Sequence, residues 1–284
     1  MMRSKIYKIL LALALLVGVE RFCRSQTEGF RLSKATSNYS YPFVEEISTC
    51  PAVLDQPFYF LGSGVQFYVF IGKDHQTVLK LFKHHHMGFS TDFLSQFLPP
   101  SHSLLKKREK RMLHLFESVK IASQKLPRQT GVIYTHLQKT DRLLGETVIH
   151  DKLHIAYPIN LDKTEFVLQK LATPVYEHLD SLFREKRIEE AIASMHSLVD
   201  LIRTRSELGI KNKDGNILEN CGFLDNQPIE LDIGSFVLRS VSTHPNPHQK
   251  AALSATLQLL GWIKRHYPEN LQECRTHLID ENIL

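Results

Sequence analysis

The stretch from Leu208 to Phe236 reads LGIKNKDGNILENCGFLDNQPIELDIGSF. It carries Asp214, then Asn220 six positions later, and then Asp232 eighteen positions after the first aspartate. Apolar residues flank the turn-forming pair Asp225-Asn226, and this arrangement is typical of a β-hairpin. Such a hairpin would return Asn220 and Asp232 to the same end.

The composition is ordinary for a folded domain. The 284 residues are 43% hydrophobic and 23% charged, which allows one large domain or two lobes. The net charge of +5 permits attraction to phosphates or to an anionic membrane surface. The four cysteines form no Cys-x-x-Cys pair, which argues against a zinc ribbon. Cys50 and Cys274 could pair if the protein is exported, and the sequence leaves that pairing open.

Residues 1–25 form an N-terminal hydrophobic segment. Arg3, Lys5 and Lys8 precede the apolar run ILLALALLVGV at 9–19. A basic start followed by such a run is typical of a secretory signal peptide, and a retained membrane anchor is the alternative. Either interpretation predicts a protein that is membrane-anchored or secreted. Residues 26–54 are interpreted as a linker because they are rich in Ser, Thr and Asn.

Residues 58–83 read FYFLGSGVQFYVFIGKDHQTVLKLFK and predict strands at 57–61, 66–71 and 77–82. Gly62-Ser63-Gly64 would make the first turn, and Lys80 would lie on the third strand. We interpret His84, His85 and His86 as a basic, exposed turn, because three adjacent side chains cannot point one way on a strand. Further strands are expected at 131–136, 146–150, 153–159 and 164–171.

The rest of the chain has mainly helical patterns. A helix is predicted at 103–126, and its basic cluster at 106–111 is interpreted as a solvated face, so no nucleic acid is expected as a partner. Helices are also predicted at 174–185, 186–207, 248–267 and 268–278. Gly209 would end the helix at 186–207.

The order of these elements is a strand-rich part, a connection, a long helix, an Asp loop, a hairpin and Asp-Ile-Gly. In this order the chain resembles the protein-kinase-like superfamily over about residues 55–265. It looks most like small bacterial kinase-like proteins with a G-I-x-x-x-D-x-x-x-x-x-N-x-G-F segment followed by D-x-G-x-F. The matching residues are Gly209, Ile210, Asp214, Asn220, Gly222, Phe223, Asp232, Gly234 and Phe236.

The resemblance implies an α+β, bilobal protein-kinase-like fold, preceded by the hydrophobic segment. Residues 55–170 would form a strand-rich N-lobe ending in a hinge at 166–170. Residues 171–284 would form a reduced helical C-lobe. ATP and Mg²⁺ would be the bound cofactors.

The same resemblance implies how the first lobe would hold the nucleotide. Gly62 and Gly64 would let the backbone approach phosphate oxygens, and Lys80 would supply positive charge. Glu117 would pair with Lys80, because it neighbours the apolar face of its helix. Glu109 is the other candidate for that pairing.

In the second lobe, Asp214 would orient the acceptor hydroxyl, while Asn220 and Asp232 would hold the metal. A rival registration places the metal ligand at Asn216, because Asn216-Ile217-Leu218 mimics the usual Asn-Ile-Leu. That registration puts Lys211 where the catalytic aspartate should be.

The chain also departs from the kinase pattern. Phe67 stands in place of the third glycine, Asn212-Lys213 stands in place of His-Arg, and no Ala-Pro-Glu follows Asp232. The sequence therefore predicts an ATP-dependent phosphotransferase acting on a hydroxyl acceptor, or a pseudokinase that serves as a membrane-associated or secreted binding protein. A third reading is a structural α+β protein in which the acidic residues only form turns. Failure of Asp214, Asn220 and Asp232 to converge would favour that reading.

Overall fold

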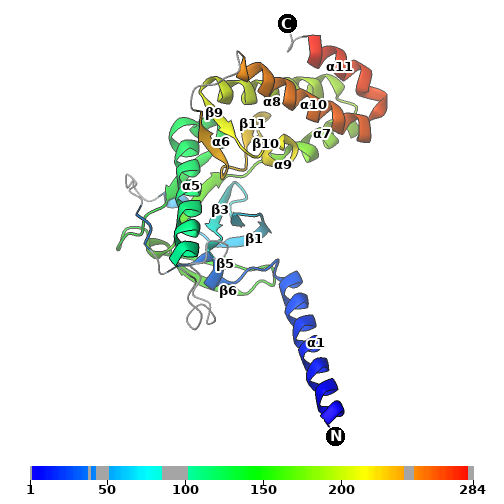
Figure 1. The fold of residues 1–284 in the computed structure, drawn as a ribbon. Helices are drawn as coiled ribbons and strands as arrows, with labels where there is room; N and C mark the ends of the chain where they lie inside the picture. The colour runs from blue at the N-terminus through cyan, green and yellow to red at the C-terminus, as the bar shows by residue number, and fades with distance from the viewer. Residues whose placement is uncertain (1, 38–39, 43–50, 85–101, 240–245, 281–284) are drawn as a thin grey trace. The chain divides into compact units, whose positions relative to one another are not determined.

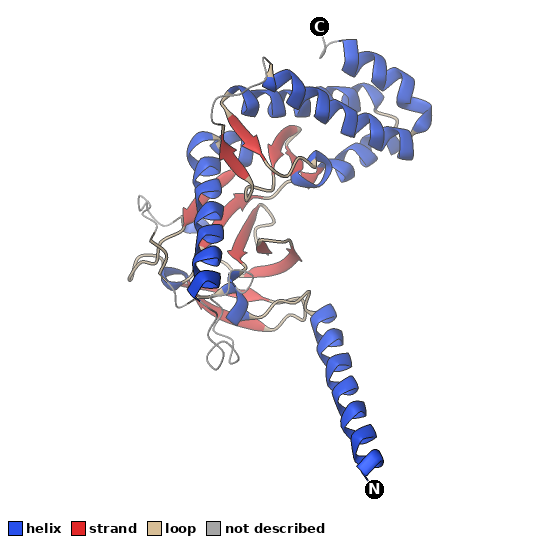
Figure 2. Ribbon diagram, viewed as in Figure 1, coloured by secondary structure: helices blue, strands red, loops and turns tan. Residues whose placement is uncertain are grey.

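The computed structural model describes residues 2–37, 40–42, 51–84, 102–239 and 246–280. The protein is a mixed α+β structure with a curled, strand-rich sheet and helices (Figures 1 and 2). The predicted α+β class is therefore confirmed. The chain divides into two compact units, a first comprising Met1–Met112 with His136–Leu168 and a second comprising Leu113–Thr135 with Gln169–Leu284.

A seven-stranded sheet has the order β4-β7-β3-β2-β1-β5-β6. Its strands, in chain order, are β1 (Phe58–Ser63), β2 (Phe67–Gly72), β3 (Thr77–Phe82), β4 (Val132–His136), β5 (Glu146–His150), β6 (Ala156–Asn160) and β7 (Phe166–Lys170). Strands β1, β2 and β3 pair antiparallel in sequence, as their short turns require. Strand β5 pairs parallel to β1, and β6 pairs antiparallel to β5. The predicted hinge at 166–170 is a strand, β7.

The first unit also contains a packed part of the segment at 26–54. Helix α2 (Leu32–Ala35) lies there, and η1 (Ala52–Leu54) precedes β1. Phe30 is buried and its ring lies 5.1 Å from that of Tyr68, 5.4 Å from that of Phe70 and 5.9 Å from that of Tyr157. Tyr68 and Phe70 are two positions apart on β2, so their rings lie on the same face of the sheet. That face needs an apolar cover. Phe30 supplies it.

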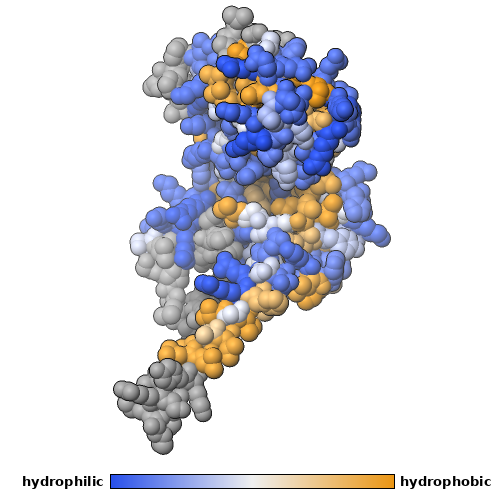
Figure 3. All heavy atoms as spheres, turned by 90° about the vertical axis from the view of Figure 1, so that its right-hand side faces the viewer, coloured by the Kyte–Doolittle hydropathy of each residue, from blue (hydrophilic) through white to orange (hydrophobic). Residues whose placement is uncertain are grey.

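Helix α1 (Met2–Gln26) forms from the N-terminal hydrophobic segment. Large apolar side chains are exposed along it, as the orange surface in Figure 3 shows: Leu10, Leu11, Leu13, Leu15, Leu16, Val17, Val19 and Phe22. Across the described ranges, no helix combines the length and the apolar character that crossing a membrane requires. The signal or anchor assignment stays a prediction.

The second unit has a helical core. Helices α7 (Val175–Arg184), α8 (Ile188–Glu207), α10 (Pro247–His266) and α11 (Leu271–Asp280) form it, with η3 (Pro268–Asn270) between the last two. Helix α8 ends at Glu207 with Leu208 as its C-cap, and Gly209 follows with φ +71°, which confirms the predicted stop. Cys274 is a free thiol in this core, and burial raises its pKa to about 11. Cys50 lies outside the described residues.

Two further helices lead into the second unit: α5 (His102–Lys125), which spans the division between the units, and α6 (Pro127–Thr130). The unit's short strands form two small sheets, one of β8 (Thr173–Pro174), β10 (Cys221–Leu224) and β11 (Gln227–Glu230), and one of β9 (Ile210–Asn212) and β12 (Phe236–Leu238). Asp225 and Asn226 join β10 to β11 with φ of 48° and 63°. Two successive left-handed residues make the tight hairpin turn that the sequence predicts.

Candidate functional site

The β10–β11 hairpin brings Asn220 and Asp232 to one end. Cys221 pairs with Glu230 in the hairpin, so the residues just outside it are neighbours. The carbonyl of Asn220 accepts hydrogen bonds from the backbone N–H of Leu231 at 2.7 Å and of Asp232 at 3.2 Å. The predicted return of the chain therefore occurs, although Asn220 ends the short helix α9 (Ile217–Asn220) rather than a strand.

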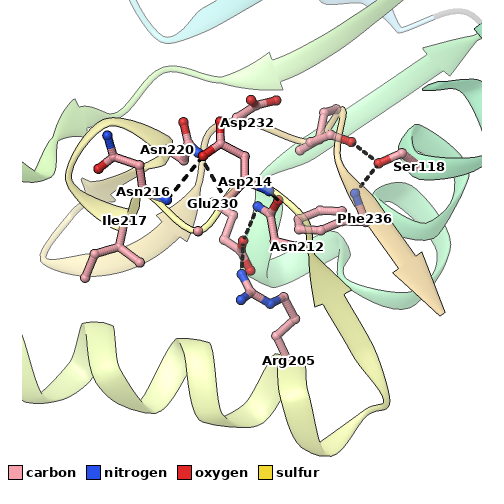
Figure 4. A network of polar contacts seen from close by, with 12 residues as sticks. Ser118, Arg205, Asn212, Asp214, Asn216, Ile217, Asn220, Glu230, Asp232 and Phe236 are labelled. Carbon is pink, nitrogen blue, oxygen red and sulfur yellow. Dashed lines mark hydrogen bonds and ion pairs between the residues drawn. The ribbon is translucent and has the colours of Figure 1, made fainter. Parts of the chain in front are cut away.

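Asp214 reaches the same place through the pairing of β9 with β12. Asn212 pairs with Phe236 in this two-stranded sheet, and the side chain of Asn212 accepts a hydrogen bond from the N–H of Asp214 at 3.0 Å. The amide of Asn220 donates to the carbonyl of Asp214 at 3.5 Å. Figure 4 shows Asp214, Asn220 and Asp232 gathered at one edge of the loop. The structure thus brings the three predicted residues together.

The remaining loop residues are fixed from α10 and by packing. The side chain of Gln258 accepts a hydrogen bond from the N–H of Ile217 at 3.1 Å and donates one to the carbonyl of Gly215 at 2.9 Å. Ile217 is buried in the helical core. Asn216 precedes α9 without a side-chain capping bond, and its N–H donates to the carboxylate of Asp214 at 3.2 Å. Asn216 is therefore also adjacent to Asp214. Asn220, however, is the residue that directly precedes the β10–β11 hairpin.

A buried ion pair supports this loop from behind. Glu230 is 0% exposed and accepts a hydrogen bond from the guanidinium of Arg205, which is 8% exposed and comes from α8. The amide of Asn212 lies 3.4 Å from the same carboxylate oxygen. Burial raises the pKa of Glu230, against the opposing effect of Arg205, and the nearby Asp232 raises it further. Because Asn212 also holds Asp214, the pair helps to position the predicted catalytic loop.

Ser118 of α5 fixes the Asp232-Ile233-Gly234 segment. Its buried hydroxyl donates to the carbonyl of Ile233 at 2.7 Å and accepts from the N–H of Phe236 at 2.6 Å. Asp232 in turn accepts from the N–H of Gly234 at 2.9 Å. No sequence pattern points to Ser118, Arg205 or Glu230, because their partners lie far along the chain.

The carboxylates of the site keep acceptor capacity. Within the described ranges, the hydrogen bond from Gly234 occupies Asp232, and that from Asn216 occupies Asp214. No group of three or more His, Cys, Asp and Glu side chains suited to a metal occurs in the described part of the chain. Two carboxylates and the amide of Asn220 nevertheless fit Mg²⁺, which is usually held by one or two carboxylates together with waters and substrate phosphates.

In the first unit, Lys80 lies on β3 as predicted. Its side chain is buried, and its Nζ lies 5.8 Å from the centre of the Phe67 ring. Gly62 belongs to β1, and Gly64 closes the turn to β2 by donating its N–H to the carbonyl of Phe67 at 3.0 Å. A side chain at Gly62 would meet no atom within 4 Å, so space beside this strand is open. Phe67, in the place of the third glycine, lies beneath Lys80.

A second lysine, Lys83, holds the glycine turn. Its Nζ donates to the hydroxyl of Ser63 at 2.6 Å and to the carbonyl of Gly64 at 2.5 Å, and lies 4.5 Å from the centre of the Tyr68 ring. Burial lowers the pKa of Lys83, and nearby Lys34 lowers it further. Lys80 and Lys83 are three positions apart along an extended segment, so their side chains leave on opposite faces. No sequence motif points to Lys83.

The two candidate glutamates on α5 fall in different units. Glu109 is half-buried in the first unit, which also contains Lys80. Glu117 is exposed in the second unit. Burial and the charge of Lys213 lower the pKa of the nearby His114. The charge of Glu117 opposes this shift only in part. Which glutamate would pair with Lys80 stays open.

The histidine run corrects one prediction. His84 is fully buried, not exposed; its Nδ1 lies 3.0 Å from the hydroxyl of Tyr41 and its Nε2 lies 3.3 Å from the carboxylate of Glu165. Glu165 is itself buried and needs such partners. His85 and His86 lie outside the described residues.

Comparison with known proteins gives little. No protein-family profile matches the chain, and no curated protein matches it. Among solved structures, the chain is similar to a medium-resolution structure of the bifunctional kinase-methyltransferase WbdD, with a TM-score of 0.33 and 14% sequence identity. The similarity covers 70% of this chain and 33% of that one, so the chain spans about a third of the length of WbdD. A similarity of this size does not establish a shared fold.

Proposed function

We propose that this protein is a kinase-like, nucleotide-binding phosphotransferase that moves the γ-phosphoryl group of ATP to a hydroxyl acceptor with Mg²⁺. The convergence of Asp214, Asn220 and Asp232 through the β10–β11 hairpin is the observation that carries the proposal. Three residues spread over nineteen positions meet at one edge of a loop, with carboxylate oxygens open to a ligand.

The proposed roles follow from the chemistry of each group. Asn220 and Asp232 would hold Mg²⁺, which would neutralise charge on the phosphates. Lys80, on β3, would supply positive charge to a nucleotide phosphate. Asp214 would orient the acceptor hydroxyl and take its proton. The acceptor oxygen would form a bond to the γ-phosphorus as the bond to the bridging oxygen breaks, and ADP would leave.

Two observations favour a second candidate, a pseudokinase that binds nucleotide or a partner without turnover. Lys83 already occupies the carbonyl of Gly64, and the ring of Phe67 fills the position where a third glycine would let the backbone approach a phosphate. Both features restrict the glycine turn. Neither feature touches the Asp214 loop. The two candidates therefore share the proposed metal site and differ in whether phosphoryl transfer occurs.

The test is the thermal stability of the full chain with and without ATP and Mg²⁺. A ligand at about 100 times its Kd should add roughly 2.7 kcal/mol of apparent stability. We expect a metal-dependent increase that is lost in Asp232→Asn and in Lys80→Met. Asp225→Asn is the matched control, because it changes an aspartate at the opposite end of the same hairpin.

Turnover then separates the two candidates. We expect Asp214→Asn to keep the ATP-dependent stabilisation and to lose phosphoryl transfer to added hydroxyl acceptors. Stabilisation without transfer in the unaltered protein would favour the pseudokinase. The absence of any stabilisation by ATP and Mg²⁺, with all variants folded, would refute the phosphotransferase and leave a pseudokinase that binds only a partner.

A further inference from the structure

We propose that the second unit carries a separate binding site for a phosphate group, in a pocket behind the Asp214 loop. The pocket has a volume of about 320 Å³ and is lined by residues of α8, β9 and the first turns of α10. Four basic residues line it and none of its lining residues is acidic; the basic residues are Arg205, Lys211, Arg239 and Lys250. The pocket therefore favours an anion.

Three residues that line this pocket each carry a buried polar atom without a hydrogen-bond partner in the described structure. Arg205 donates to Glu230 through one terminal nitrogen, but its Nε has no hydrogen-bond partner in the described structure. The same holds for the hydroxyl of Ser206, which is 5% exposed, and for one terminal nitrogen of Arg239. A buried donor without an acceptor is costly. The oxygens of a ligand would supply the missing acceptors.

The beginning of α10 adds to this site. Pro247 opens the helix, and Asn246 before it makes no side-chain capping bond. The first N–H groups of a twenty-residue helix thus have no side-chain cap, and the positive end of the helix dipole lies at the pocket. Together with the guanidinium groups, this arrangement suits the oxygens of a phosphate.

The size and lining of the pocket favour a small phosphorylated organic molecule over free phosphate. The volume exceeds that of one phosphate ion, and Ile202, Ala251 and Ala255 add apolar surface beside Ser254 and Gln258. Such a lining suits a ligand with a phosphate at one end and a short carbon skeleton at the other. A phosphate monoester and inorganic phosphate share the charged group, so the experiment must separate them.

This site is distinct from the proposed nucleotide site. Asp214, Asn220 and Asp232 do not line the pocket, whereas Asn212, Gly215 and Ile217 of the same loop do. A ligand in the pocket would therefore touch the loop from the side opposite its open carboxylates. The proposal does not depend on phosphoryl transfer.

The test is calorimetric titration of the full chain with inorganic phosphate and with glycerol 3-phosphate, both without nucleotide or metal. We expect saturable binding, tighter for glycerol 3-phosphate, and weakened by about tenfold or more in Arg239→Gln, because a charged hydrogen bond is lost. Ser206→Ala should weaken it several-fold. Arg203→Gln is the matched control, because Arg203 lies on α8 in an ion pair with Asp200 and does not line the pocket.

Three results would overturn the proposal. The first is no binding of either compound to the folded protein. The second is wild-type affinity in Arg239→Gln and Ser206→Ala. The third is loss of binding in Lys80→Met, which would assign the phosphate to the nucleotide site instead. Equal affinity for the two compounds would overturn the proposal that the ligand is an organic phosphate and would leave inorganic phosphate as the occupant. A urea midpoint for each variant confirms that it is folded.

Discussion

Two aspartate-bearing loops of this protein use their carboxylates in opposite ways. In the first unit, Asp162 is 3% exposed and accepts hydrogen bonds from the hydroxyl of Thr140 at 2.5 Å and from the N–H groups of Leu143, Leu144 and Gly145. Burial alone would raise the pKa of Asp162, but these four donors together lower it to about 2. In the second unit, Asp214 and Asp232 each accept one backbone hydrogen bond in the described structure.

The difference separates an acid that holds a fold from acids that can hold a ligand. A saturated carboxylate has no lone pair left for a metal or a substrate proton, whereas an open one has. Both kinds lie in turns, so a motif alone cannot distinguish them. Glu230 also serves the fold, because one of its oxygens is held by Arg205 and Asn212, although its Oε1 has no hydrogen-bond partner in the described structure.

The largest expected effect is at Glu230. Glu230→Ala would leave the guanidinium of Arg205 buried without its carboxylate, which typically costs about 3–5 kcal/mol of unfolding free energy. Urea denaturation of the full chain measures it. Glu219→Ala, which removes an exposed acid from the same loop, is the control and should be nearly neutral. A loss below about 1 kcal/mol at Glu230 would show that the pair does not support the loop.

A smaller effect is expected at Asp162, and it should depend on pH. The pKa of Asp162 is about 2 in the folded protein, against an ordinary 3.8. At any pH above 3.8, the ionised carboxylate therefore stabilises the fold by roughly 2 kcal/mol. The stabilisation should disappear as pH falls from about 4 toward about 2. Asp162→Ala should lose it at neutral pH, and its stability should vary less over that acidic range. A variant with the same acid dependence as the unaltered protein would contradict the assignment.

The smallest stability effects are expected for the open pair. Asp214→Asn and Asp232→Asn keep an oxygen that accepts the existing backbone hydrogen bond, so each should change unfolding free energy by less than about 0.5 kcal/mol. The measurement is the same urea transition without ligand. If either variant were as destabilised as Asp162→Ala, its carboxylate would be structural, and the contrast between the two loops would fail.

Local features of the fold could be predicted from the sequence. The short runs rich in apolar and β-branched residues at 77–82 and 146–150 predict β3 and β5 with their observed bounds. The Asp225-Asn226 pair predicts a turn because both residues tolerate left-handed backbone. These predictions succeed since each depends on a few neighbouring residues. The meeting of Asn220 with Asp232 follows from the hairpin alone.

Features that depend on distant contacts could not be predicted. Ser118 lies 115 positions before the carbonyl that it binds at Ile233, and no periodicity signals such a bond. His84 looks like part of an exposed basic run until Glu165 and Tyr41 are placed beside it. Phe30 sits in a polar stretch, and only the aromatic face of β2 explains its burial. The contacts that hold the candidate site in place, from Ser118 and from Arg205 with Glu230, also depend on residues far apart in the sequence.

The contact of Gln258 with the Asp214 loop has a consequence for the order of biosynthesis. The side chain that ties Ile217 and Gly215 comes 41 positions after Ile217. At roughly 5–20 residues per second, a ribosome would add Gln258 on the order of seconds after the loop, so the Asp214 loop of a nascent chain lacks this contact during that interval. The last helices are thus the step that completes the site during translation.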